Sequence, residues 1–378
     1  MPCDYDQLPH AGIRDLIPYV PGKSSDELAR ERGLTRIIKL ASNENPLGCS
    51  PLVTQALTHL APQKIAAYPM SVNHPLRQKL ADSSGVDTEM ITLGNGSDSL
   101  FCLLLTCFAL HNNKHILTHQ YAFSSYAIQA KTLGIPVVTT AVNSDFSVDV
   151  DALINACNEH TALIFLANPN NPTGLLIDHT EIKRLLEHIP ETTLFVLDEA
   201  YFEYTCRFGL SPTPSSCWAK AQPTIELLKK HPNLVITRTF SKAYGLAGLR
   251  LGYAIANPQI TALLYRIQLP FVVNIAALTA GFAALDDEDF IQKTVQVNNQ
   301  GLKHMQQGLH ALGFTQLPSS ANFITFDCNR DCLPIYQELQ HHGIIVRPLH
   351  PYGLKNYLRV TIGTEEQNHF FLDKMILY

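Results

Sequence analysis

One lysine follows an apolar segment in a setting that favours covalent chemistry. The segment LVITRTFSKAYGLAGLR (234–250) contains Lys242 shortly after its β-branched part. A lysine at a buried strand end loses solvation, which lowers its pKa and makes the amine nucleophilic towards an aldehyde. Thr239, Ser241 and Arg250 add hydroxyls and a permanent cation, which suit a phosphate. A lone lysine after a strand is usually a solvated charge, so the other motifs must decide between the two interpretations.

Other apolar segments also end in polar residues. The segment LFVLDEAY (194–201) contains Asp198 and Tyr201, and NPNNPTG (168–174) contains Asn171. An aspartate facing a protonated pyridine nitrogen keeps that ring cationic, so that the ring acts as an electron sink. The Tyr201 phenol and the Asn171 amide suit an oxygen of the same ring, and proline stiffens the turn that carries the amide. Taken singly, these residues are equally compatible with a plain strand end and a structural turn.

The segment GNGSDS (94–99) predicts a glycine turn followed by an apolar helix. Ser97 and Asp98 stand at the expected start of that helix, where free N–H groups bind an anion; simple capping is the alternative. The segment lacks the GxGxxG and GxxxxGK[ST] patterns, which argues against a dinucleotide or P-loop nucleotide site. Further along, Tyr121 in THQYAFSSY is a candidate for stacking on a flat ring, or for simple packing.

Short β-branched segments that alternate with helical patterns must hold these residues in place. We predict strands at 90–93, 115–118, 136–140, 162–166, 194–197, 234–237 and 252–256. Such alternation is typical of an α/β fold with a mostly parallel sheet, in which ligands bind beyond the carboxyl ends of the strands. After about residue 270 we predict a long helical stretch to about residue 312. The segments NFITFD, GIIVRPL and YLRVTIGT, with a helix near 333–342, then predict a smaller α+β domain.

Length and composition agree with this organisation. The chain has 378 residues, of which 46% are apolar, enough for about two domains with sizeable cores. We expect an N-terminal arm over 1–34, a large domain over 35–270 and a small domain over 271–378. In the arm, Ser24 or Ser25 can cap a helix over SDELARERGL.

Charge and cysteine usage exclude several classes of protein. The net charge of −5 offers no broad cationic surface, so we expect no nucleic acid partner. Nine cysteines without CxxC spacing argue against a disulfide scaffold and a zinc ribbon, and we expect a cytoplasmic location and no metal. The N-terminus lacks the pattern of a signal peptide, and no apolar segment reaches the ~20 residues that span a bilayer, so we expect no membrane partner.

In combination and in this order, the segments resemble the fold-type I pyridoxal 5′-phosphate (PLP)-dependent aminotransferases, from the arm nearly to the C-terminus. The resemblance implies PLP as the cofactor, bound in the large domain, and Lys242 as the lysine that carries it as a Schiff base. It also implies catalytic roles for Asp198 and Tyr201. The remaining implied contacts to the cofactor are with the ring for Asn171, Asp198 and Tyr201, with the phosphate for Ser97, Asp98, Thr239, Ser241 and Arg250, and by stacking for Tyr121.

Within that superfamily the chain is most similar to the histidinol-phosphate aminotransferases. The similarity lies in Pro18-Tyr19, LASNENPLG, Tyr68-Pro69, GIIVRP and LRVTIGT. It implies that Tyr19, Asn171, Arg347 and Arg359 bind the substrates, and that Tyr68 reaches the cofactor phosphate of a second copy in a homodimer with shared active sites. Ser99, where relatives often have glutamate, and the absence of a proline before Tyr121 depart from the pattern and bear on the substrate more than on the cofactor.

The resemblance implies transfer of an amino group between L-histidinol phosphate and 2-oxoglutarate, giving imidazole acetol phosphate and L-glutamate, a step of histidine biosynthesis. An aromatic-amino-acid aminotransferase is an alternative, because imidazole and phenyl rings make similar demands on an apolar pocket. A threonine-phosphate decarboxylase-like lyase is another, because it keeps the same cofactor site. A ligand-binding domain of a transcription regulator is disfavoured, since no helix-turn-helix pattern precedes the fold.

Overall fold

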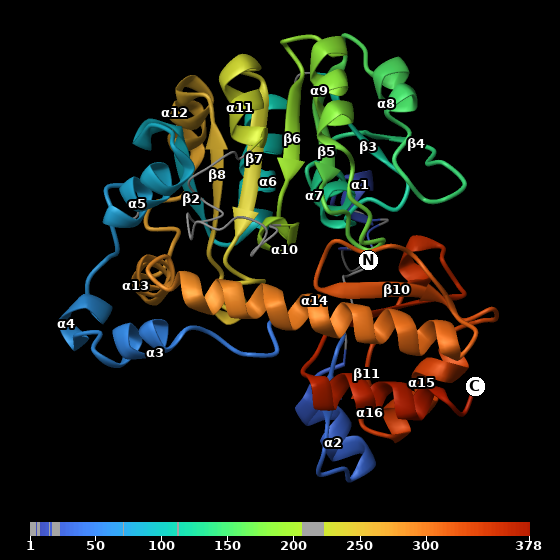
Figure 1. Cartoon of the computed structure of the whole chain (residues 1–378). Coiled ribbons are helices and arrows are strands. Elements are labelled where there is room, and N and C mark those ends of the chain that lie inside the picture. Colours follow the sequence, from blue (N-terminus) through green and yellow to red (C-terminus); the bar gives the residue numbers. More distant parts are fainter. Residues whose placement is uncertain are drawn as a thin grey trace, which may run out of the picture.

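Seven strands form the central sheet of the computed structural model, which describes residues 5, 8–14, 16, 23–70, 72–111, 113–205 and 223–378. In spatial order they are β2 (Ile91–Gly94), β8 (Gly252–Ala256), β7 (Leu234–Thr239), β6 (Leu194–Asp198), β5 (Thr161–Ala167), β3 (His115–His119) and β4 (Val137–Thr140) (Figure 1). All seven strands predicted from the sequence are therefore confirmed, with ends that differ by at most two residues. The predicted α/β class is confirmed with them.

The sheet is mostly parallel, with one strand reversed. Strands β7, β6, β5, β3 and β4 pair in parallel along the sheet. Strand β8 is antiparallel to both of its neighbours, β7 and β2. The carboxyl ends of β5, β6 and β7 consequently meet at one edge, where we expected the site.

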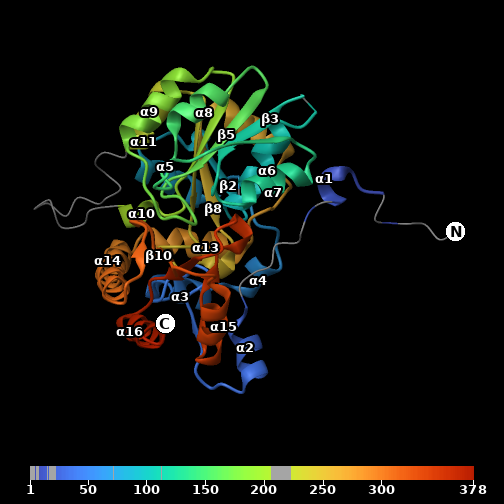
Figure 2. The same cartoon turned by 90° about the vertical axis from the view of Figure 1, so that its right-hand side faces the viewer.

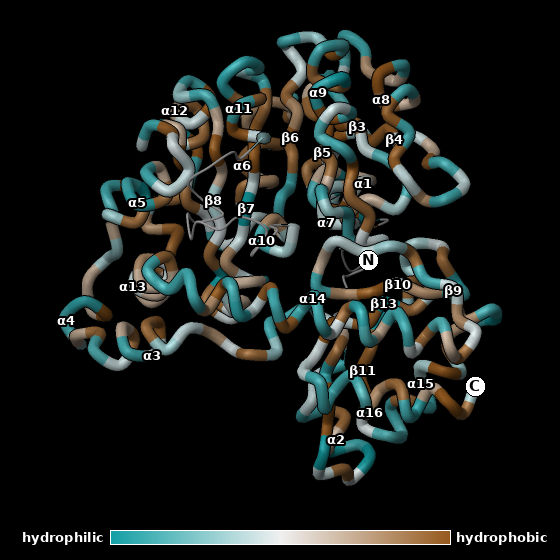
Figure 3. The backbone as a smooth tube through the Cα atoms, in the orientation of Figure 1, coloured by the Kyte–Doolittle hydropathy of each residue, from teal (hydrophilic) through white to brown (hydrophobic). Residues whose placement is uncertain are grey.

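Alternate residues of each strand supply two separate apolar layers. In β5, Ile164 and Leu166 belong to one buried cluster and Leu163 and Phe165 to the other, as side chains with a period of two require. The first cluster includes helices α5 (Pro75–Ser84), α8 (Val150–Ala156), α9 (His179–His188) and α11 (Pro223–Lys230). The second includes α6 (Ser97–Phe108), α7 (Ser125–Thr132) and α12 (Pro258–Ile267). Figure 2 shows these helices on the two faces, and Figure 3 shows the hydrophobic strands between them.

The C-terminal third contains a second sheet, ordered β12 (Arg347–Pro348), β13 (Tyr357–Thr361), β10 (Phe323–Asp327) and β9 (Thr315–Gln316). Helices α15 (Leu333–His341) and α16 (Glu365–Met375) complete it, and η4 (His350–Tyr352) connects β12 to β13. The predicted long helical stretch is divided into α13 (Ile275–Ala284) and α14 (Glu288–Ala311). The division falls here because the Asp287 side chain caps α14 by accepting a hydrogen bond from the Phe290 N–H.

A segment near the N-terminus lies with this C-terminal sheet. Strand β1 (Ile38–Lys39) pairs in parallel with β11 (Ile344–Ile345). Ile38 and Leu40 are buried in the same cluster as Ile324 and Val360. We therefore propose that the chain divides near residue 270, as the sequence predicts, and that the segment around β1 joins the C-terminal unit.

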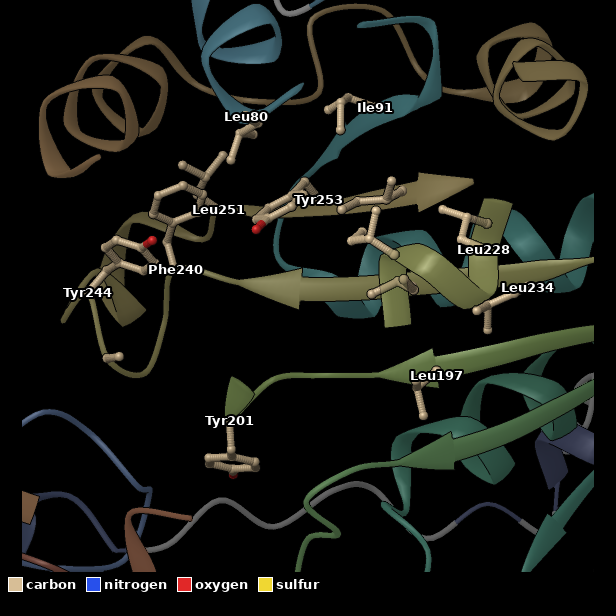
Figure 4. Packing of buried hydrophobic residues seen from close by; sticks show 14 of the residues in the cluster. Leu80, Ile91, Leu197, Tyr201, Leu228, Leu234, Phe240, Tyr244, Leu251 and Tyr253 are labelled. Carbon is tan, nitrogen blue, oxygen red and sulfur yellow. The ribbon is translucent and has the colours of Figure 1, made fainter. Parts of the chain in front are cut away.

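The remaining helices are short. They are α1 (Ala11–Arg14), α2 (Ser25–Arg32), α3 (Pro51–Thr58), α4 (Pro62–Ile65), η2 (Thr88–Met90), α10 (Phe202–Thr205) and η3 (Ala247–Leu249). Ser24 caps α2 in a capping box with Glu27, which selects it over Ser25. Figure 4 shows the packing beside the site, where the rings of Phe240 and Tyr244 lie close together after β7.

Candidate active site

A cavity of about 240 Å³ lies where the central sheet faces the C-terminal unit. Most of the residues predicted for the site line it, namely Ser97, Asp98, Asn171, Asp198, Tyr201, Thr239, Ser241, Lys242, Arg250, Arg347 and Arg359. We call Asp198, Tyr201, Thr239, Ser241 and Lys242 the sheet wall, because they follow or end β6 and β7. We call Arg347, Tyr352 and Arg359 the C-terminal wall.

Lys242 lies in a tight turn after β7. Its Nζ donates a hydrogen bond to the Ser42 carbonyl at 3.0 Å. Burial, followed by the positive charge of Arg359, lowers the pKa of Lys242 to about 8. The turn needs glycine at position 245, where φ is +69° and a Cβ would lie 1.8 Å from the Gly48 carbonyl oxygen. With a pKa of about 8, the Lys242 amine is partly neutral near physiological pH, as a nucleophile requires.

Asp198 is a buried carboxylate at the end of β6. It accepts hydrogen bonds from Tyr126 Oη at 2.7 Å and from Thr237 Oγ1 at 3.2 Å. Burial raises the pKa of Asp198 to about 7, against these two hydrogen bonds. A cationic group next to the carboxylate would favour its ionised form. The site therefore suits a positively charged ring nitrogen.

The Tyr201 phenol is oriented by an asparagine from another part of the chain. Asn43 Nδ2 donates to Tyr201 Oη at 2.8 Å, so the phenol accepts here and keeps its own O–H for the cavity. Burial raises the pKa of Tyr201 to about 12, so the phenol is protonated. Asn43 also binds Thr361 of β13 through its N–H, which connects the sheet wall to the C-terminal unit.

Several hydrogen-bond donors lie together at the other side of the cavity. We call Ser97, Thr239, Ser241 and Arg250 the anion cradle. Thr239 Oγ1 donates to Ser241 Oγ at 3.0 Å, and Arg250 Nη1 donates to the same oxygen at 3.3 Å. Ser97 is the first residue of the 12-residue helix α6. Gly96 has φ +74°, which favours glycine, and a Cβ there would lie 2.6 Å from Arg250 Nη2, so a larger residue would displace the guanidinium.

Asp98 lies beside this cradle and contacts two of its neighbours. Its carboxylate lies 3.7 Å from Arg250 Nη2 and accepts a hydrogen bond from Ser125 Oγ. The Asp98 carboxylate thus lies beside the Arg250 guanidinium, while the Asp98 backbone N–H belongs to the first turn of α6, so the predicted contact of Asp98 with the phosphate stays a prediction.

The C-terminal wall places two arginines on neighbouring strands. Arg347 of β12 is directly opposite Arg359 of β13 in an antiparallel pair. Arg359 Nη1 donates to Asn171 Oδ1, and its Nη2 donates to the Ala41 carbonyl at 2.7 Å. Like charges directly opposite each other in a sheet are destabilising, so this pair is suited to an anionic ligand.

Behind the sheet wall, a buried ion pair joins β6 to the neighbouring strand. Arg238 Nε and Nη2 donate to Glu199 Oε2 at 2.8 and 2.6 Å, and both side chains are at most 5% exposed. The guanidinium also lies 3.8 Å from the centre of the Phe202 ring. Because Glu199 follows Asp198 and Arg238 precedes Thr239, this pair fixes the spacing of the two strand ends.

Two of the predicted residues that the structure describes do not line this cavity. Tyr121 has φ +60° and packs its ring 5.5 Å from that of Phe146, whereas Phe123 lines the cavity in its place. Phe123, and not Tyr121, is therefore the aromatic residue of this loop that lines the cavity, and the stacking role of Tyr121 stays a prediction. Tyr68 is 79% exposed and stacks on Phe271. Tyr19 lies outside the described residues.

Several cavity residues were not singled out from the sequence. They are Asn43, Glu44, Phe123, Ser124 and Tyr352. The signal for the first two was present, because they belong to the segment LASNENPLG. For Ser124 and Tyr352 no motif distinguishes them from ordinary loop residues.

The fold and the arrangement of the cavity side chains define a class of protein, and comparisons with known proteins agree with it. Residues 35–375 match the family model for aminotransferase class I and II, and the chain belongs to this family.

Its relatives include enzymes with a more specific name. The chain is 56% identical to histidinol-phosphate aminotransferase 2 of Legionella pneumophila (strain Lens) over 98% of both chains. It is 43% identical to histidinol-phosphate aminotransferase 2 of Pasteurella multocida over 97% of both. A crystal structure of histidinol-phosphate aminotransferase from Sinorhizobium meliloti in complex with pyridoxal 5′-phosphate matches with a TM-score of 0.85 and 27% identity, over 98% of this chain and 97% of that one.

Proposed function

We propose that this chain is a PLP-dependent transaminase that interconverts L-histidinol phosphate and 2-oxoglutarate with imidazole acetol phosphate and L-glutamate. Full-length relatives that carry this name at up to 56% identity support the assignment. The observation that carries it is the pair of arginines opposite Lys242, which suits a donor with a strongly anionic group.

The residues of the cavity fit PLP. The cradle of Ser97, Thr239, Ser241 and Arg250 offers hydroxyls, a helix N-terminus and a cation for its phosphate. Asp198 suits the ring nitrogen, and the two side chains that suit the ring oxygen are Asn171 and Tyr201. When bound, PLP supplies an aldehyde carbon for covalent attachment and a cationic ring that withdraws electrons.

The chain's own residues then bind, orient and move protons. Lys242 Nζ, with its lowered pKa, can take up the proton that leaves the amino-bearing carbon of the donor and return it in the reverse direction. Asp198 holds positive charge at the far end of the cavity, and Tyr126 and Thr237 keep its carboxylate in place. Arg347 and Arg359 bind the anionic group of the donor or the carboxylate of the oxo acid.

A substrate panel on purified holoenzyme tests this proposal. We expect kcat/KM for L-histidinol phosphate to exceed those for phenylalanine and tyrosine by about 10⁴-fold, because a dianionic phosphate forms charge-assisted hydrogen bonds with two guanidinium groups that a neutral aromatic ring cannot form. A phenylalanine value equal to or above that for histidinol phosphate would replace the proposal with an aromatic-amino-acid aminotransferase. Release of CO₂ from threonine phosphate would replace it with the decarboxylase.

We also propose that the protein is a homodimer in which Tyr68 reaches the cofactor phosphate of the second copy. The support is a set of exposed apolar side chains around Tyr68, namely Ile65, Met70, Leu269 and Phe271, each at least 45% exposed. A second copy of this chain would cover them. Sedimentation should show a dimer, and Tyr68→Phe should weaken retention of PLP. A fully active monomer would contradict the proposal.

For the compartment we propose the cytoplasm, on the grounds of the cysteine spacing. Among the described residues, no helix combines the length and apolar character needed to cross a membrane. Fractionation of cells that express the native chain tests the location.

A further inference from the structure

One phenol of the C-terminal wall crosses the cavity. Tyr352 ends η4 and lines the cavity with Arg347 and Arg359. Its Oη donates to Ser124 Oγ on the opposite side at 3.4 Å, near the upper limit for a hydrogen bond. Ser124 precedes α7, and its side chain makes no capping bond to that helix. Two hydroxyls from opposite sides of the cavity thus meet in a weak contact that a stronger ligand can replace.

The backbone that carries Tyr352 is held firmly. The Tyr352 N–H donates to the Leu349 carbonyl at 2.9 Å, and the turn closes at Gly353 with φ +77°. At the other end of η4, His350 Nε2 lies 3.3 Å from Asp331 Oδ1. His350 Nδ1 lies 3.6 Å from Cys332 Sγ. These contacts anchor η4 to the start of α15, so the phenol is presented from a fixed base.

The surroundings of the phenol favour an anion. Arg347 is five residues before Tyr352 along the chain, and Arg359 is its partner across the strands. A phenol O–H adds an uncharged donor to two guanidinium groups. The three side chains of the C-terminal wall, two guanidinium groups and a phenol, are all hydrogen-bond donors, and none of them is acidic.

We propose that Tyr352 contacts the amino donor, its phenol O–H donating to the donor's phosphate beside Arg347 and Arg359, and that it closes against Ser124 when that phosphate is absent. The proposal rests on the proposed function for the identity of the donor. It adds to the two arginines an uncharged residue that discriminates phosphorylated from unphosphorylated donors.

The test compares Tyr352→Phe with wild-type holoenzyme on L-histidinol phosphate and on phosphate-free L-histidinol. A hydrogen bond to a charged group predicts that the variant loses about ten- to a hundredfold in kcat/KM for the phosphorylated donor, through KM. For L-histidinol, kcat/KM should change less than threefold. Equal losses with both donors, a loss confined to kcat or a drop in bound PLP would overturn the proposal, as would no change at all.

Two variants and one ligand keep this result interpretable. Tyr378→Phe removes a phenol at the C-terminus, outside the cavity, and should leave both donors unaffected. Ser124→Ala should change KM less than threefold, and a loss as large as that of Tyr352→Phe would overturn the proposal. Inorganic phosphate should compete with any active donor about tenfold less well in Tyr352→Phe. This readout separates failure of the inference from failure of wild-type enzyme to use histidinol phosphate, which would refute the proposed function alone.

Discussion

The sheet wall and the C-terminal wall hold their polar groups by different means. On the sheet wall, Asp198 has two hydrogen-bond donors of its own, and Thr239 and Ser241 bind each other. The C-terminal wall opposes two arginines and holds one of them by an amide and a carbonyl, which are neutral. The acceptor of the first wall is thus matched by donors within the protein, whereas the side-chain charge of the second wall is entirely positive.

The difference corresponds to the two kinds of ligand in the proposed reaction. A cofactor that stays bound is held best by a rigid set of matched hydrogen-bond partners. Donor and oxo acid must both bind and leave through the same wall, and a permanent cation that accepts either a phosphate or a carboxylate permits this. Changes to the sheet wall should therefore abolish chemistry, and changes to the C-terminal wall should alter preference.

The largest effect is expected for Lys242→Ala on the sheet wall. Loss of the nucleophile and proton carrier should reduce turnover by about 10⁴-fold, the upper end of the range for positioned proton transfer. Borohydride reduction of wild-type holoenzyme followed by peptide mapping should place the pyridoxyl group on Lys242. The exposed Lys131→Ala is the control, and a label on any other lysine would refute the assignment.

A smaller loss is expected for Asp198→Asn, because an amide keeps the shape but cannot hold a cationic ring. We expect turnover to fall by about 10²- to 10³-fold while the fold and some binding of PLP persist. Half-reaction kinetics and circular dichroism measure the two quantities. Tyr126→Phe, which removes one donor to the same carboxylate, should cost less, and near-normal rates for Asp198→Asn would mean that it is not the ring partner.

The ion pair behind the sheet wall should matter for stability. Arg238→Ala leaves Glu199 buried without its partner and should lower the free energy of unfolding by about 3–5 kcal/mol. Urea denaturation of the purified chain measures this. The exposed pair Arg36–Glu366 provides the control, since its side chains are 53% and 78% exposed, and Arg36→Ala should hardly shift the midpoint. Equal shifts for both variants would show that the buried pair contributes nothing special.

The smallest expected effect is electrostatic and couples the two walls, because Arg359 influences the pKa of Lys242. The neutral amine of Lys242 captures the cofactor aldehyde, so the capture rate of apoenzyme should rise about tenfold per pH unit below the pKa of about 8 and level off above it. Arg359 contributes to that lowered pKa, and Arg359→Gln should therefore move the break to higher pH. Stopped-flow absorbance with PLP gives the profile, and an unmoved break would show that the walls are electrostatically independent.

Much of the fold could be predicted because it depends on local patterns. The seven β-branched segments became the seven strands, and the polar residues at their ends met in one cavity because the carboxyl ends of parallel strands share an edge. The family prediction is confirmed by the match over residues 35–375. The site roles that follow from it stay predictions.

What escaped prediction depends on distant contacts or on backbone conformation. Tyr121 and Phe123 are two aromatic residues in one loop, and no sequence pattern distinguishes Phe123, which lines the cavity, from Tyr121, which does not and which has a left-handed φ. Asn43 is placed by partners more than 150 residues away. Tyr352 depends on η4, whose anchor at His350 no sequence pattern reveals. The division at Asp287 rested on a single capping aspartate within a stretch that is otherwise helical.

The pairing of β1 with β11 has a consequence for synthesis on the ribosome. Residues 38–45 leave the ribosome early, but their partners Ile344, Ile345 and Thr361 are translated some 300 residues later. Until then, Ser42 and Asn43 lack the strand pairing and the Thr361 contact that hold them from the C-terminal side, and Arg347 and Arg359 have not been made, so a nascent chain that already contains the whole central sheet still lacks a finished cavity. The enzyme is therefore assembled in a fixed temporal order, with its reactive lysine made well before the wall that selects what the lysine meets.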